Sequence, residues 1–200
     1  MIPTVIDLLR HGEPEGGHCY RGQIDDPLSA LGWQQMRQIV PAELPWQQIV
    51  TSPLSRCAAF AEELTRSSGL PLTYEPRFME IGFGEWEGKT ATELEAADKQ
   101  AFYAFYDDPL LNTPPGAEPL NEFQQRIVAA WRDLLNQYQQ RHILLVAHAG
   151  TIRMILAHVL DIPLHAVFRI QVPYAGLSRI SVSDAGARAY AQLQFHAGRL

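Results

Sequence analysis

Two histidines in this 200-residue chain directly follow short apolar runs, where a side chain is well placed to do chemistry. His11 follows the run at 4–10, which ends in Arg10, and His148 follows the run at 143–147. In open α/β sheets the ligand crevice lies beyond the carboxyl ends of the strands. If both runs are inner strands, the two imidazoles meet at one edge of the sheet, beside the guanidinium of Arg10.

A second arginine follows another short apolar run, at 49–50. Arg56 stands near the start of a helix predicted over 54–66, which begins just after that run. A guanidinium makes bidentate, charge-assisted hydrogen bonds with phosphate, and the first turn of a helix adds unpaired N–H groups. Together with Arg10 and the two histidines, Arg56 is expected to form a pocket that suits an anion.

Glu80 is the candidate proton donor, in a stretch whose glycines between 82 and 88 keep the backbone adaptable. A carboxyl group in a partly dry site can hold a proton near neutral pH and deliver it to an oxygen that leaves phosphorus. By composition alone, Glu85 and Glu87 are alternatives for this role.

The elements that must position these residues alternate along the chain. Apolar periodicity and stop signals predict helices over 29–40, 54–66, 92–106, 120–139 and 151–160. Strands are predicted at 4–10, 49–50, 72–74, 143–147, 167–172, 177–182 and 189–195. Such alternation predicts an α/β fold, a three-layer α/β/α sandwich with a mostly parallel central sheet. The strand order stays open, and the polar stretch at 13–27 is expected to be a loop over the site.

Composition sets the broad class of the protein. With 46% apolar and 19% charged residues, the chain is expected to fold as a single globular domain over 1–200. The formal net charge of −6 argues against general affinity for nucleic acid or an anionic membrane. Without a basic leader or a long apolar run, we expect a cytoplasmic location. Cys19 and Cys57 are expected to be free thiols, and no spacing of histidines predicts a metal site.

Four ordered segments carry a family resemblance: 10–13 (RHGE), 52–56 (SPLSR), 80–88 (EIGFGEWEG) and 146–150 (VAHAG). They resemble the signatures of the histidine phosphatase superfamily, which includes metal-independent phosphatases and the bisphosphoglycerate-dependent phosphoglycerate mutases. One short motif is a weak signal, but four in this order across nearly the whole chain are a strong one. The resemblance implies a phosphoglycerate mutase-like fold.

The resemblance also implies a two-step phosphoryl transfer that uses no metal or other cofactor. His11, as neutral imidazole, attacks phosphorus and forms a phosphohistidine, while Arg10, Arg56 and His148 hold the phosphoryl oxygens. Glu80 then protonates the leaving alcohol and later takes a proton from the hydrolytic water.

Three features favour a phosphatase over a mutase. Glu80 and His148 lie 68 positions apart (148 minus 80), fewer than in the mutases; the segment 82–88 resembles the small phosphatases; and 14–22 lacks the Ser/Thr and Asn of the mutases. Within the phosphatases, the chain resembles the α-ribazole phosphate phosphatases of cobalamin biosynthesis, so α-ribazole 5′-phosphate is the expected substrate. A mutase-type isomerase and a non-catalytic module that binds phosphorylated ligands are the alternatives.

Residues around the expected pocket are candidates for choosing the substrate, a small phosphorylated metabolite. Tyr20 could stack on a ring, Arg21 could reach an anionic group, and Gly150 follows His148 closely enough to touch the substrate. Where relatives often read PGGES, this chain has PGAEP at 115–119, so the serine that would cap the next helix or touch the substrate is absent. A monomer or a homodimer is expected.

Overall fold

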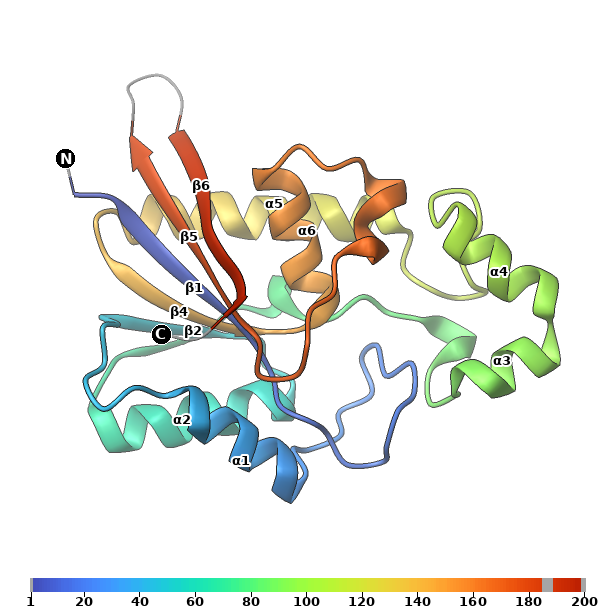
Figure 1. Cartoon of the computed structure of the whole chain (residues 1–200), viewed down its shortest axis with the longest axis horizontal. Helices are drawn as coiled ribbons and strands as arrows, with labels where there is room; N and C mark the ends of the chain where they lie inside the picture. The colour runs from blue at the N-terminus through green and yellow to red at the C-terminus, as the bar shows by residue number, and fades with distance from the viewer. Residues whose placement is uncertain (1, 185–188, 199–200) are drawn as a thin grey trace.

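A single six-stranded sheet forms the centre of the computed structural model, which describes residues 2–184 and 189–198 (Figure 1). The strands lie in the order β3-β2-β4-β1-β5-β6. Their bounds are β1 (Thr4–Arg10), β2 (Gln48–Thr51), β3 (Leu72–Tyr74), β4 (His142–Ala147), β5 (Leu177–Asp184) and β6 (Ala189–Gly198). Strands β1 to β4 are parallel, and β5 and β6 are antiparallel additions at the edge beside β1. The sheet is therefore mostly parallel.

Helices cover both faces of this sheet (Figure 1). Helices α1 (Ala30–Ile39) and α2 (Ser55–Ser68) pack on one face, and α5 (Leu120–Gln137) and α6 (Ala149–Val159) on the other. Residues of β4 alternate between the two faces: Leu144 and Val146 join the core under α1 and α2, while Leu145 joins the core under α5 and α6. The predicted three-layer α/β/α sandwich is confirmed.

The helix boundaries follow the local signals. Ser29 caps α1, since its hydroxyl accepts a hydrogen bond from the Gly32 N–H at 3.0 Å. Helix α2 ends at Gly69, which has a positive φ of 74° and closes the helix with its own N–H. Pro119 precedes α5 and supplies no side-chain cap, as expected from the missing serine.

Two sequence-based element predictions are wrong. The segment predicted as a strand at 167–172 forms instead a 3₁₀ helix (Leu164–Arg169) and an irregular stretch; Pro163 begins the helix, and Val167 and Val172 are buried in the core shared with α6. The single helix predicted over 92–106 is broken at Asp98 into α3 (Ala91–Ala97) and α4 (Lys99–Asp107). The Asp98 carboxylate caps α4 by accepting the Ala101 N–H at 2.9 Å, and this favours a new helix start.

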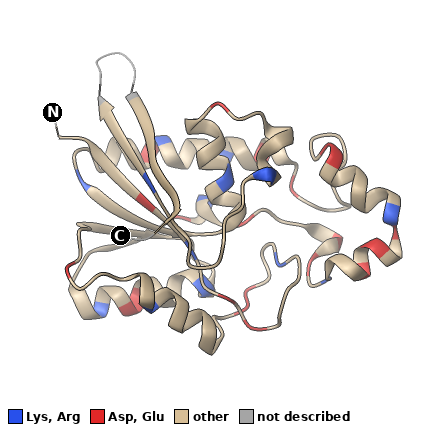
Figure 2. Cartoon of the chain, in the orientation of Figure 1, with Lys and Arg blue, Asp and Glu red and all other residues tan. Residues whose placement is uncertain are grey.

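Helices α3 and α4 stand to one side of the sandwich (Figure 1). Together with the short 3₁₀ turn Gly84–Trp86 they form an aromatic cap, residues 84–107, with a small core of its own made by Trp86, Leu94, Phe102 and Phe105. Acidic and basic residues are spread over the elements (Figure 2). Within the described part of the chain, no helix is both long and apolar enough to cross a membrane.

Candidate active site

The pairing of β1 with β4 brings the two histidines together. Arg10 and Ala147 are register partners at the ends of these strands, and the His11 N–H donates to the Ala147 carbonyl at 3.0 Å. The imidazole rings of His11 and His148 lie with centroids 5.2 Å apart and planes at 61°. Both rings are buried, with exposed fractions of 5% and 0%. The site therefore lies at the carboxyl edge of the parallel strands, where the sequence placed it.

His11 is arranged as a nucleophile. Its Nδ1 lies 2.7 Å from the Gly12 carbonyl, which can only accept, so Nδ1 carries the proton and Nε2 keeps its lone pair. Burial, together with the charges of Arg10 and Arg56, holds the pKa of His11 well below its ordinary value. The imidazole is therefore neutral at pH 7, the form in which its nitrogen can attack an electrophile.

Arg10 has hydrogen-bonding capacity left for a ligand. Its Nη1 donates to the Val172 carbonyl at 2.6 Å, and its guanidinium carbon lies 4.0 Å from the centroid of the Tyr174 ring. Its Nε is buried and has no hydrogen-bond partner in the described part of the chain. A buried arginine N–H without an acceptor is costly, so this group favours an incoming anion.

Arg56 joins the site to the active-site loop, residues 13–27. The side chain is 1% exposed at the start of α2, and its Nη1 and Nη2 donate to the carbonyls of Ile24 and Gly22 at 2.7 and 2.8 Å. Its Nε donates to Nδ1 of His148 at 3.3 Å. These contacts use three of the five N–H donors of a guanidinium, which leaves two for a ligand.

His148 is oriented by groups on two sides. Because Arg56 can only donate, Nδ1 of His148 accepts, and Nε2 donates to the Ser52 hydroxyl at 2.7 Å. Burial, followed by the charges of Arg56 and His11, lowers its pKa well below the ordinary value. Sequence reasoning included Ser52 in a motif but gave it no role; in the structure it fixes the second imidazole.

Glu80 is held by backbone N–H groups. One carboxylate oxygen accepts from Ile81 and the other from Gly150, each at 3.0 Å. Gly150 lies in the first turn of α6, where the helix dipole favours negative charge. A Cβ at Gly150 would lie 2.1 Å from Oε1 of Glu80, so only glycine leaves room for this carboxylate. The structure thus places Gly150 against the candidate acid, and the substrate contact expected of it stays a prediction.

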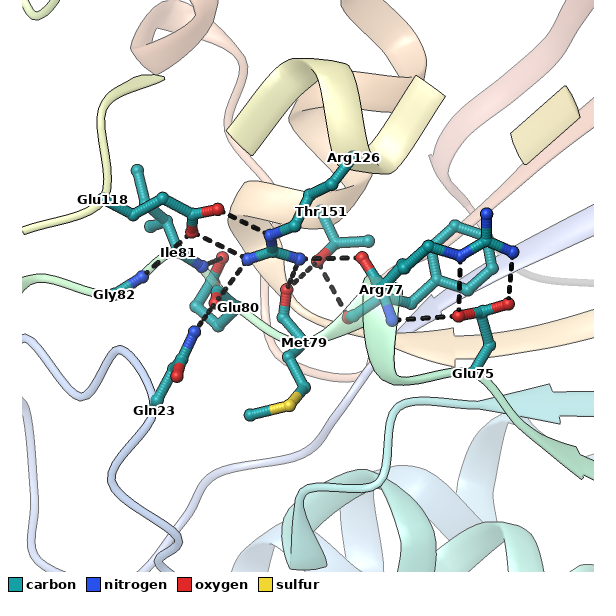
Figure 3. A network of polar contacts seen from close by, with 11 residues as sticks. Gln23, Glu75, Arg77, Met79, Glu80, Ile81, Gly82, Glu118, Arg126 and Thr151 are labelled. Carbon is teal, nitrogen blue, oxygen red and sulfur yellow. Dashed lines mark hydrogen bonds and ion pairs between the residues drawn. The ribbon is translucent and has the colours of Figure 1, made fainter. Parts of the chain in front are cut away.

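The backbone around Glu80 is clamped by Arg126 of α5 (Figure 3). The guanidinium donates to the carbonyls of Arg77, Met79 and Glu80 at 2.7, 2.9 and 3.0 Å. Glu118 pairs with it through both carboxylate oxygens, at 2.6 and 2.8 Å. Sequence analysis missed this clamp. The position of Arg126 next to the buried helix residues Phe123 and Ile127 could have indicated that its side chain lies at the core side of α5.

The other predicted residues have different surroundings. Arg21 is buried and donates to Asp26 at 2.9 Å and to the carbonyls of Glu15 and Gly17, so its guanidinium anchors the active-site loop. The ring of Tyr20 packs against the aromatic cap, and its hydroxyl contacts that of Tyr106. For both residues a substrate contact stays a prediction.

Of the alternative acids, Glu87 accepts hydrogen bonds from the backbone N–H groups of Gln23 and Phe83 at 3.0 and 2.9 Å, and so joins the active-site loop to the cap. Glu85 is exposed. Glu80 is the acid candidate that lies at the start of α6, just after His148, and its role as the acid stays a prediction.

This combination of groups suits the transfer of a phosphoryl group. Two neutral imidazoles, two arginines and one carboxylate converge on the same sheet edge, as described above. Fixed cations stabilise the negative charge of the phosphoryl oxygens in the transition state. A nucleophile that is already held in place lowers the entropic part of the activation barrier.

A family model and several curated relatives match this chain. The family model described as "Histidine phosphatase superfamily (branch 1)" matches residues 6–192. The glucosyl-3-phosphoglycerate phosphatase of Mycolicibacterium vanbaalenii is 32% identical over 169 residues, which cover 78% of this chain and 74% of the relative. The adenosylcobalamin/alpha-ribazole phosphatase of Escherichia coli is 25% identical, with 88% of this chain and 89% of the relative covered. Three mycobacterial relatives are longer, and the chain spans 50% of each.

Solved structures show the same fold. The crystal structure of the alpha-ribazole phosphatase from Shigella flexneri superposes with a TM-score of 0.84 at 24% identity, covering 98% of this chain and 96% of that one. The predicted phosphoglycerate mutase-like architecture is thereby confirmed.

Proposed function

Because the chain belongs to the histidine phosphatase superfamily (branch 1), we propose that it hydrolyses phosphomonoesters without a metal, through a phosphohistidine at His11. The observation that carries the proposal is the neutral, buried imidazole of His11, whose Nε2 keeps its lone pair and whose pKa is lowered by burial and by the charges of Arg10 and Arg56. Relatives named as phosphatases support the reaction class.

In the first step Nε2 of His11 attacks phosphorus, the P–N bond forms, and the bond from phosphorus to the ester oxygen breaks. Glu80 enters this step protonated and gives its proton to the departing oxygen, so that an alcohol leaves. Arg10 and Arg56 hold phosphoryl oxygens, as fixed donors do in phosphoryl transfer, and His148 joins them when its Nε2–H exchanges the Ser52 hydroxyl for a phosphoryl oxygen.

In the second step a water attacks phosphorus and the P–N bond breaks. Glu80, now a carboxylate, takes a proton from that water, and inorganic phosphate leaves. His11 returns to its neutral form, so the cycle needs no redox partner or cofactor.

The proposed substrate is a small phosphorylated metabolite, and α-ribazole 5′-phosphate is the compound that the sequence favours. The resemblance to the Escherichia coli alpha-ribazole phosphatase supports it. The Mycolicibacterium relative is named for a different ester, so the family alone leaves the substrate open.

The test is chemical trapping of the intermediate. Brief incubation with ³²P-labelled substrate and an alkaline quench should leave label on His11 that is lost in acid. The His11→Ala variant should lose the label and at least about 10³-fold of kcat. The matched control is His165→Ala, which removes an exposed histidine and should behave as the unchanged protein.

A wild-type rate in His11→Ala would overturn the proposal. Glycerate phosphates separate the remaining alternatives, since isomerisation faster than phosphate release would identify a mutase. Phosphate binding measured by calorimetry, with no turnover of any ester, would identify a binding module.

A further inference from the structure

The ring of Tyr174 lies against Arg10, one of the two arginines of the site. The guanidinium carbon of Arg10 is 4.0 Å from the centroid of this ring, and no cation–π contact in the described part of the chain is shorter. The negative face of an aromatic ring attracts a cation, and the attraction is stronger where water is excluded. Tyr174 is half-buried and has no role in the chemistry described so far.

Arg10 has few other contacts that fix its side chain. Its Nη1 donates to the Val172 carbonyl at 2.6 Å, but its Nε has no partner among the described residues, and none of their ion pairs includes it. Arg56, by contrast, donates through three nitrogens to two loop carbonyls and to His148. One hydrogen bond holds one end of the Arg10 guanidinium but leaves its plane free to turn. Contact with a flat ring restricts that plane.

The strap, residues 172–176, fixes this ring relative to the end of β1. The Ala175 N–H donates to the His11 carbonyl, and the Gly176 carbonyl accepts the Arg10 N–H, both at 3.1 Å. Ala175 has a φ of 51°, a left-handed conformation that is costly for a residue with a Cβ and persists only where the surroundings impose it. The backbone on the C-terminal side of the ring is therefore held against the two residues that begin the site.

Two imidazoles also lie beside the Tyr174 ring. The ring of His11 has its centroid 5.8 Å away, with planes at 48°. The ring of His18, from the active-site loop, is 6.0 Å away and close to parallel, with planes at 26°. The Tyr174 ring therefore has neighbours from the end of β1 and from the loop, in addition to its own strap. A ring that is restrained in this way can restrain a cation in turn.

We propose that Tyr174 is a positioning residue, which holds the Arg10 guanidinium through the face of its ring so that the free donors of Arg10 meet the phosphoryl oxygens. This inference rests on the proposed function and adds to it a residue that works through Arg10. Because the attraction comes from the electrons of the ring face, the ring matters and the hydroxyl does not. The substituents on the ring should therefore tune the phosphate site.

Two variants at position 174 separate the ring from the hydroxyl. In Tyr174→Leu the kcat/KM for p-nitrophenyl phosphate should fall about tenfold, the factor that a cation–π contact in a partly dry site provides. The inhibition constant of inorganic phosphate should rise at least about threefold, because Arg10 binds the phosphate itself. Tyr174→Phe keeps the ring face and should stay within about twofold of the unchanged protein in both measurements. A merely structural role would lower kcat through the folded fraction and leave the phosphate constant unchanged.

Fluorinated rings test the electrostatic origin of the effect. Phenylalanine with increasing numbers of fluorine atoms, incorporated at position 174, keeps the shape of the ring but withdraws electrons from its face. The kcat/KM should fall stepwise as fluorine is added, because each step weakens the attraction for Arg10. A flat series would overturn the proposal.

A double-mutant cycle then assigns the effect to Arg10. In the Arg10→Gln background, which lacks the cation, Tyr174→Leu should change kcat/KM by no more than about twofold. The same tenfold loss in both backgrounds would show that the ring acts on another group, and would overturn the proposal. The control is Tyr190→Leu, because Tyr190 is 58% exposed and pairs with Ser183, near the end of the sheet where β1 begins. It should leave kcat/KM and the phosphate constant unchanged.

Thermal unfolding followed by circular dichroism checks that each variant folds. If Tyr174→Leu does not fold, the fluorinated series decides. A wild-type kcat/KM in a folded Tyr174→Leu would overturn the proposal, and so would a Tyr174→Phe that is as impaired as Tyr174→Leu, since the hydroxyl would then be the active part. Failure of the underlying function has a different signature, because the unchanged protein would then release no phosphate from any ester, including p-nitrophenyl phosphate.

Discussion

The first turn of α6 positions two of the proposed catalytic groups. His148 stands just before this helix, and the Gly150 N–H holds the Glu80 carboxylate. One rigid helix start therefore sets the distance between the second imidazole and the acid. If the two groups were held by flexible loops instead, the imidazole of His148 and the carboxylate of Glu80 could move independently of each other.

Gly150→Ala tests this placement. The added Cβ would lie 2.1 Å from Oε1 of Glu80 and 3.2 Å from the Phe123 ring, so the carboxylate must move. Alanine favours the helix itself, so the fold is expected to persist. A displacement of about 1 Å at a reacting group can cost about 10²-fold in rate, and kcat should fall by roughly that factor.

Steady-state kinetics and the inhibition constant of inorganic phosphate measure the outcome of Gly150→Ala. The phosphate constant should stay within about threefold, because the arginines and histidines are not moved. An unchanged kcat would contradict the role of Gly150 in holding the acid. Ala157→Gly in the same helix, away from Glu80, is the control for a general change in α6.

Among the individual site residues, sequence analysis predicted those that directly follow the end of a strand. His11 and His148 were found in this way because a strand end in a parallel sheet has a fixed relation to the crevice. Arg126 was not found, because it projects from within a helix toward a segment that lies far from it in the sequence. Which way a helix faces depends on packing, and the sequence pattern marked Arg126 only as a charge beside apolar residues.

Among the elements, α5 does more than cover the sheet. Arg126 of this helix donates hydrogen bonds to three backbone carbonyls of the segment at 77–80, those of Arg77, Met79 and Glu80. This segment has little regular structure of its own, only the 3₁₀ turn Pro76–Phe78. The helix therefore supplies the rigidity that the segment before Glu80 lacks.

Arg126→Met should affect both stability and rate. Because the carbonyls lose a charged donor, the free energy of unfolding should fall by about 2 kcal/mol in total. Because Glu80 is displaced, kcat should fall about tenfold or more, while KM changes little. Urea unfolding and steady-state kinetics measure the two effects. Glu118→Gln, which weakens the ion pair but keeps the carbonyl contacts, should have a smaller effect on kcat. A normal kcat in a destabilised Arg126→Met would show that the clamp is structural only.

Prediction of elements failed where tertiary packing decided between two local possibilities. The alternating apolar residues at 167–172 fit a strand, but β5 already occupies the place beside β1, and the segment packs on α6 instead. The break at Asp98 was missed because helical periodicity continues on both sides of it. A capping aspartate inside a periodic stretch is the signal that sequence analysis could have used.

In the whole molecule, Asp7 ties the sheet together at its centre. This buried carboxylate accepts from Trp46 at 2.7 Å, from His142 of β4 at 2.9 Å and from Arg179 of β5 at 2.7 and 2.9 Å. Burial alone would raise the pKa of Asp7, but the hydrogen bonds from Arg179, His142 and Trp46 outweigh it and lower the pKa.

Asp7→Asn should therefore destabilise the protein in a pH-dependent way. Because the folded pKa lies below the unfolded value, the carboxylate stabilises the fold above about pH 4, and this stabilisation is lost as pH falls through the folded pKa. At pH 7 the variant should lose about 3 kcal/mol of unfolding free energy, as expected when one partner of a buried ion pair is removed. Chemical unfolding at several pH values should show the difference from wild type shrinking below pH 4.

Asp133→Asn is the matched control, because Asp133 pairs with Arg77 at the surface and is 61% exposed. It should cost no more than about 1 kcal/mol. Equal losses in the two variants, or a loss in Asp7→Asn that is independent of pH, would argue against a stabilising charge at position 7.

The aromatic cap has its own small core. It meets the rest of the chain through Phe168, through the contact between Tyr20 and Tyr106, and through Glu87, which accepts the Gln23 N–H of the active-site loop. A segment that is stabilised from within can be exchanged without rebuilding the sheet or the phosphoryl site. A graft of residues 84–107 between relatives can therefore leave the sheet intact if it keeps Glu87, the residue that holds the backbone of the active-site loop.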